Sequence, residues 1–148
     1  MALASLFRCT IFASGKDAQI LRLNKKFRLD LLIIYPNIFC STKKIYQKNK
    51  KMNPNKSQFF LNIKNNKKLI HFLKNNDNDL EQIVIKIYPK IKKIIDYIKL
   101  QKGCLFSRIT GSGSACIGIF SSRHDAIYAQ KAIRSKYPKY WSVVSKTI

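Results

Sequence analysis

The residues best suited to chemistry lie in one short segment, 108–115, which reads Arg-Ile-Thr-Gly-Ser-Gly-Ser-Ala. Two glycines allow the backbone to adopt positive φ angles and to approach a ligand closely. Consecutive amides in such a turn form a concave site that binds anions, and the Thr and Ser hydroxyls add donors. Taken alone, the pattern fits a tight turn between two strands equally well. The candidate site residues are Thr110, Gly111, Ser112, Gly113 and Ser114, with Arg108 in support.

The other reactive residue types do not form a recognisable site. The glycine segment is not a Walker phosphate loop, because no Lys-Ser or Lys-Thr follows at the required spacing. The four cysteines lack a C-x-x-C spacing and only His71 and His124 could join them, so we expect free thiols and no metal site. Two interpretations of Arg108 are equally good: a surface salt bridge to Asp79 or Glu81, and a role beside the loop.

The glycine segment must be held by the elements around it. Apolar residues at 105–109 and 116–120 predict strands on either side of the segment. After these come a helix at 123–136, capped by Ser121 or Ser122 and ended by Pro138, and a last strand at 141–147.

An amphipathic helix precedes these strands. Apolar residues recur at steps of three and four between Leu80 and Ile98, while most Lys residues fall off this stripe. Asn78 can cap the helix, with Glu81 returning the hydrogen bond three residues later. Pro89 should divide the segment into two helical pieces.

The first half of the chain is less regular. A buried strand is expected at 29–35, followed by the turn pair Pro36-Asn37 and by a short helix from Ser41-Thr42 through Tyr46. Residues 47–68 form a Lys- and Asn-rich connection, and 69–76 form another short helix. Together the elements predict an α+β fold in which an antiparallel sheet carries helices on one face.

Charge is the most unusual property of the composition. The chain has 148 residues, enough for one domain, with 29 Lys and Arg against 7 Asp and Glu and a formal net charge of +22. Such a charge attracts polyanions, including RNA. The basic residues are mostly Lys, and Asn and Ile are also frequent, so AT-rich codon usage would produce the same composition without a nucleic-acid partner.

The sequence predicts neither a membrane-spanning helix nor a signal peptide. No apolar run approaches the ~20 residues of a membrane helix. The apolar start, 1–13, is interrupted by Arg8 and lacks a preceding basic segment, which argues against a signal peptide. We therefore expect a cytoplasmic location.

Four sequence blocks occur in an order that is typical of one enzyme superfamily. They are Ile33-Ile34-Tyr35-Pro36-Asn37 with Ser41-Thr42 and Tyr46; Asn78-Asp79-Leu80-Glu81; 107–120 around the glycines; and 140–145, which reads Tyr-Trp-Ser-Val-Val-Ser. The third block resembles the third conserved motif of the GHMP kinases and is closest to its form in the 4-diphosphocytidyl-2-C-methyl-D-erythritol kinases. The resemblance covers residues 29–148.

This resemblance implies a domain organisation and a chemistry. Residues 29–148 would form the GHMP kinase C-terminal type of domain, and 1–28 would be the residual end of the N-terminal domain. Such kinases transfer the γ-phosphoryl group of ATP, with Mg²⁺, to a substrate hydroxyl. The loop at 110–114 would close on the active site near the phosphates or the substrate.

The chain also departs from the family pattern. It has no counterpart of the family's substrate-binding Lys or of its glycine- and serine-rich ATP loop. Segment 2–8 aligns with the family's A-L-G-S-D-V-P, which puts Leu6 at the catalytic Asp position and Arg8 at the Pro position. Since Leu cannot accept a proton, no catalytic residue is assigned.

Three functions follow as hypotheses. The first is a truncated kinase homologue, inactive alone and binding no cofactor by itself. The second is the C-terminal half of a split kinase, which would use ATP and Mg²⁺ once a separate N-terminal fragment docks onto it. The third is a basic protein that binds RNA or another polyanion.

Overall fold

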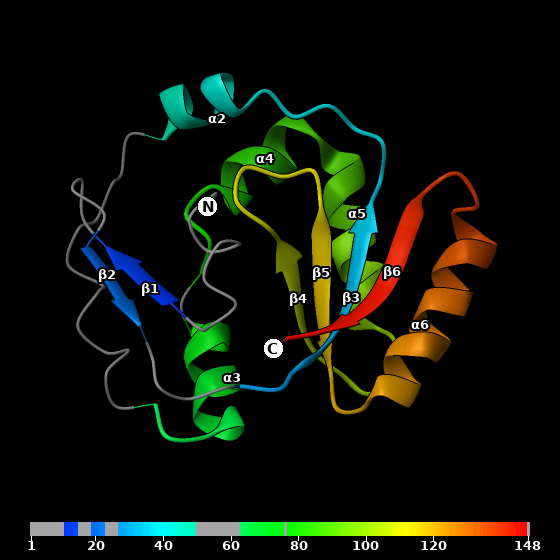
Figure 1. Cartoon of the computed structure of the whole chain (residues 1–148). Coiled ribbons are helices and arrows are strands. Elements are labelled where there is room, and N and C mark those ends of the chain that lie inside the picture. Colours follow the sequence, from blue (N-terminus) through cyan, green and yellow to red (C-terminus); the bar gives the residue numbers. More distant parts are fainter. Residues whose placement is uncertain (1–10, 15–18, 23–26, 50–62, 76, 148) are drawn as a thin grey trace.

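The computed structural model describes residues 11–14, 19–22, 27–49, 63–75 and 77–147, so the predictions on Leu6 and Arg8 lie outside the described residues. Its main body is a four-stranded antiparallel sheet in the order β4-β5-β3-β6 (Figure 1). The short strands β1 (Ile11–Ser14) and β2 (Gln19–Arg22) pair separately.

The four strands are β3 (Asp30–Tyr35), β4 (Cys104–Ile109), β5 (Cys116–Phe120) and β6 (Trp141–Lys146). Strand β3 is central and pairs with β5 on one side and with β6 on the other, so that Leu32 lies opposite both Gly118 and Val144. Strand β4 forms one edge of the sheet and joins β5 through the glycine loop. The strands predicted at 29–35, 105–109, 116–120 and 141–147 are confirmed to within one residue.

Five helices are described: α2 (Thr42–Lys48), α3 (Asn66–Asn75), α4 (Glu81–Ile87), α5 (Pro89–Lys99) and α6 (Arg123–Lys136). The division at Pro89 and the bounds of α6 agree with the sequence prediction, and Ser122 caps α6 by accepting a hydrogen bond from the Asp125 amide. Both ends of the predicted 47–68 connection are helical, since α2 reaches residue 48 and α3 begins at 66. None of the described helices is long and apolar enough to cross a membrane.

The larger hydrophobic core lies between one face of the sheet and helices α5 and α6. Leu32 and Ile34 of β3 point into it, together with Ile94, Ile98 and Ile133 of the two helices. The Ile98 side chain of α5 packs directly onto β5 at Gly118, where an added Cβ would lie 2.5 Å from Ile98 Cγ2. The predicted antiparallel sheet with helices on one face is therefore confirmed for α5 and α6.

A second, smaller core lies on the opposite face. Because side chains alternate along a strand, Leu31 points away from the larger core. This side gathers Phe27, Leu29, Phe106 and Ile119, and Leu69 of α3 packs among them. Helix α3 thus covers part of the second face, near the β4 edge (Figure 1).

Candidate functional site: the glycine loop between β4 and β5

The loop at 110–115 lies at the end of the sheet next to α4 (Figure 1). Gly111 and Gly113 have φ angles of 53° and 79°, the positive values that the sequence pattern predicts. The Thr110 amide donates to the Ala115 carbonyl at 2.9 Å, and the Gly113 amide donates to the Thr110 carbonyl at 2.9 Å. The Gly113 amide is therefore used within the turn itself.

Asn78 and Glu81 hold the loop from the start of α4. The Asn78 amide nitrogen donates to the Gly111 carbonyl at 2.8 Å, while Asn78 Oδ1 accepts from the Leu80 amide at 3.1 Å. The Glu81 carboxylate accepts from the Ile109 amide at 2.8 Å. The predicted capping box is wrong on this point, because the Glu81 side chain bonds to the edge strand β4 and not to the Asn78 amide.

The start of α2 flanks the loop from another side. The hydroxyls of Thr42 and Ser112 lie 3.0 Å apart and share a hydrogen bond. A Cβ on Gly113 would lie 3.3 Å from Val84 Cγ1 and 3.5 Å from Cys40 Sγ, so the loop passes closely between α4 and the segment before α2. Sequence reasoning treated Thr42 only as part of a helix start. Thr42 belongs to the Ser41-Thr42 block of the family resemblance, and that block was the signal that could have identified it as a site residue.

Ser114 is the most unusual residue of the loop. Ser114 is only 4% exposed, and its hydroxyl has no hydrogen-bond partner among the residues that the structure describes. A buried polar group without a partner costs about 1–3 kcal/mol. Such a group calls for a partner outside the described residues.

Arg108 has a different surrounding from the loop residues. Its guanidinium donates to the Leu73 carbonyl at the end of α3, and its Cζ lies 4.8 Å from the centre of the Phe106 ring. Burial lowers the pKa of Arg108, and the carboxylates of Glu81 and Asp77 act in the opposite direction. The contact with the Leu73 carbonyl connects α3 to β4, and this gives Arg108 a structural role in the described fold.

The arrangement can bind an oxyanion but carries no general base of its own. Thr110, Ser112 and Ser114 offer hydroxyl donors around two glycines, and no carboxylate lies among the loop residues. Burial raises the pKa of the nearby Cys116 thiol to about 12, which keeps it protonated. Within the described ranges no three His, Cys, Asp or Glu residues gather as a metal site.

Comparison with known proteins places this geometry in a family. Residues 60–139 match the family model described as "GHMP kinases C terminal". The chain is 33% identical over 137 residues to the 4-diphosphocytidyl-2-C-methyl-D-erythritol kinase of Pelagibacter ubique (strain HTCC1062), covering 89% of the chain and 46% of that enzyme. It is 34% identical over 145 residues to the kinase of the same name from Wolbachia pipientis wMel, covering 93% and 48%.

Solved structures support the same fold. A 4-(cytidine 5'-diphospho)-2C-methyl-D-erythritol kinase superposes with a TM-score of 0.72 at 18% identity, over 94% of this chain and 50% of that structure. A homoserine kinase from Cytophaga hutchinsonii superposes with a TM-score of 0.67 at 16% identity, over 93% and 47%. The chain spans about half the length of the curated relatives it matches. With more than half of its residues in the matched model, the chain belongs to the GHMP kinases and carries their C-terminal domain.

Proposed function

We propose that this chain forms the C-terminal side of the active site of a 4-diphosphocytidyl-2-C-methyl-D-erythritol kinase and that it transfers no phosphoryl group alone. The observation that carries the proposal is the buried Ser114 hydroxyl, which has no hydrogen-bond partner among the described residues, in a glycine loop that contains no carboxylate of its own. The neighbouring Glu81 carboxylate is engaged by the Ile109 amide. The likeness to kinases of this name supports the substrate class.

The loop residues would act by positioning. Phosphoryl transfer depends mainly on alignment of the reactants and on stabilising charge at the phosphoryl oxygens. The Ser114 hydroxyl would donate to a phosphate or substrate oxygen, and Asn78 would keep the loop in place through its bond to the Gly111 carbonyl. The described residues fit an oxyanion but offer no carboxylate set for Mg²⁺, so ATP and Mg²⁺ would be held by the N-terminal half of such a kinase.

An exposed aromatic surface supports a partner domain at this end of the sheet. The register pairs Ile34 with Cys116, which places the following residue, Tyr35, at the same end as the glycine loop. Tyr35 lies opposite Trp141, and both are exposed, as is Phe39 at 83%. Large exposed apolar side chains gathered in one region mark a contact surface. We assign it to the N-terminal half. Because the proposed reaction uses ATP, we also propose a cytoplasmic location.

The test compares the chain alone with a chimaera that joins the N-terminal half of the Pelagibacter ubique relative to this chain. With ATP, Mg²⁺ and the diphosphocytidyl substrate, we expect turnover by the chimaera and none by the chain. Ser114→Ala in the chimaera should lower kcat about tenfold, the scale of one lost charge-assisted hydrogen bond, whereas Ser145→Ala on β6 should not. Turnover by the chain alone would overturn the proposal. A folded chimaera without turnover would show that the loop is no longer competent.

The net charge of +22 favours a second candidate, binding of RNA or another polyanion. Lysines line the exposed faces of α5 and α6. If phosphate contacts drive such binding, affinity for a single-stranded RNA should fall by orders of magnitude between low and moderate salt. Affinity that hardly changes with salt would exclude this candidate.

A further inference from the structure

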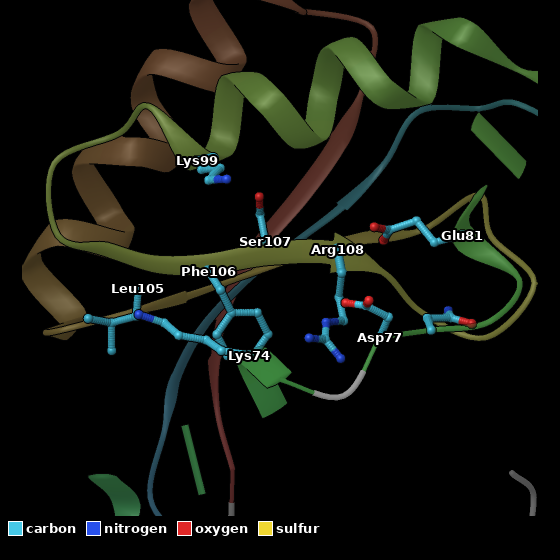
Figure 2. Close-up of a pocket in the computed structure, with 9 residues that line it drawn as sticks. Lys74, Asp77, Glu81, Lys99, Leu105, Phe106, Ser107 and Arg108 are labelled. Carbon is cyan, nitrogen blue, oxygen red and sulfur yellow. The ribbon is translucent and has the colours of Figure 1, made fainter. Parts of the chain in front are cut away.

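A hollow lies along the edge of the described sheet, beside β4 (Figure 2). Its volume is about 340 Å³, within the range of ligand sites. Strand β4 crosses it, with Lys99 at the end of α5 on one side and Lys74 at the end of α3 on the other. We call this hollow the β4 groove. The glycine-loop proposal does not use it.

The backbone of β4 points hydrogen-bonding groups into the β4 groove. The amide of Ile109 faces away from β5, because it donates to the Glu81 carboxylate, and the Ile109 carbonyl faces Asn78 Nδ2 at 3.5 Å. In an antiparallel pair the direction of the backbone groups repeats every second residue. Ser107 therefore presents its N–H and C=O on the same open side. Its side chain turns to α5 instead and donates to the Ile95 carbonyl at 2.8 Å.

The β4 groove has a positive end and a negative end. Lys74 and Lys99 lie at the beginning of β4, where both also act on the thiol of Cys104; burial raises the pKa of that thiol to about 11 and the two lysines lower it. Asp77 and Glu81 lie at the other end, beyond Arg108 (Figure 2). A ligand that lies along β4 would meet cations first and carboxylates about four residues later.

We propose that the β4 groove binds the carboxyl-terminal segment of an extended peptide, which adds to β4 as an antiparallel strand. In that direction the peptide's terminal carboxylate lies between Lys74 and Lys99, while its preceding residues pair with the backbone of Ser107. The register of β4 is shifted between Cys104 and Phe106, so the regular part of the strand beside the groove is 106–108. It spans about 10 Å at ~3.3 Å per residue, which fits about three peptide residues. A small anion would satisfy the lysines but would leave the backbone groups of Ser107 unused.

The proposal is tested on the full chain with a synthetic probe. The probe is an acetylated hexapeptide of alternating valine and threonine that ends in aspartate with a free carboxylate. The matched control peptide ends in an asparagine amide. Titration followed by amide NMR should shift the amides of Leu105, Ser107 and Arg108 with the first peptide, and the control should bind at least several-fold more weakly.

Two pairs of variants separate strand addition from simple charge attraction. Ser107→Pro removes an outward-facing N–H, which an edge strand tolerates, together with the hydroxyl bond to the Ile95 carbonyl, and it should abolish binding. Ser107→Ala loses the same hydroxyl bond but keeps the N–H, and it should bind normally. Lys74→Gln and Lys99→Gln should each weaken binding about two- to fivefold, and Lys93→Gln on α5 should not.

Three results would overturn the proposal. The first is binding by Ser107→Pro as tight as by Ser107→Ala. The second is displacement of the peptide by inorganic phosphate at equal concentration, which would make the β4 groove a plain anion site. The third is the absence of shifts at Ser107 with millimolar peptide.

Discussion

Replacing Asn78 by Ala tests how the glycine loop is held. The Asn78 side chain bonds both to the glycine loop and to the residue before α4. Its amide nitrogen donates to the Gly111 carbonyl at 2.8 Å, and its oxygen accepts from the Leu80 amide at 3.1 Å. Ala removes both bonds and leaves a partly buried carbonyl and amide without those partners.

The expected loss follows from these two bonds. A net protein hydrogen bond contributes about 0.5–1.5 kcal/mol, and removal of a capping side chain costs about 1 kcal/mol. We therefore expect the Asn78→Ala variant to lose about 2 kcal/mol of unfolding free energy. In a chain of 148 residues this lowers Tm by roughly 8 °C.

Thermal unfolding followed by circular dichroism measures the change, and hydrogen exchange at 111–114 reports the loop itself. Asn78→Asp keeps the acceptor for the Leu80 amide but loses the donor to Gly111, so it should fall between wild type and Asn78→Ala. Asn66→Ala, which removes an exposed bond to the Arg28 carbonyl, is the matched control and should cost less than 1 kcal/mol. A loss below 0.5 kcal/mol in Asn78→Ala, with unchanged exchange in the loop, would refute this account of how the loop is held.

Three further predictions concern the core, acid stability and thiol reactivity. Gly118→Ala should cost about 1–3 kcal/mol in chemical denaturation, because its Cβ would lie 2.5 Å from Ile98 Cγ2. Hydrogen bonds from two serine hydroxyls lower the pKa of Asp125, so its stabilisation is present above about pH 4 and is lost as pH falls through the lowered pKa; Asp125→Asn should flatten the acid side of a stability–pH curve. Cys116, with its pKa raised to about 12, should resist iodoacetamide at pH 8 until the chain unfolds, as peptide mass mapping would show.

The regular elements could be predicted because their signals are local. Pro89 fixes the break between α4 and α5, and Ser122 begins α6, as the residue types indicate. The apolar run at 29–35 predicts the strand β3 but not the strands that pair with it. The pairing of β3 with both β5 and β6 could not be predicted, because strand partners depend on the whole sheet.

The support of the candidate site could be predicted only in part. The loop residues and their positive φ angles follow from the Gly-x-Gly spacing. The partner of Glu81 does not, because a local capping bond and a bond to a distant strand look the same in sequence. The contact between Thr42 and Ser112 joins residues 70 positions apart, and no periodicity indicates it.

The central position of β3 in the sheet has a consequence for folding during synthesis. Asp30 of β3 lies opposite Phe120 of β5 and Lys146 of β6, so both partners of this strand are synthesised long after it. Contacts between residues so far apart in sequence slow folding and leave apolar strands uncovered meanwhile. During synthesis β3 therefore stays unpaired on both edges until β5 and β6 have left the ribosome. Its need for chaperone protection should last through this interval.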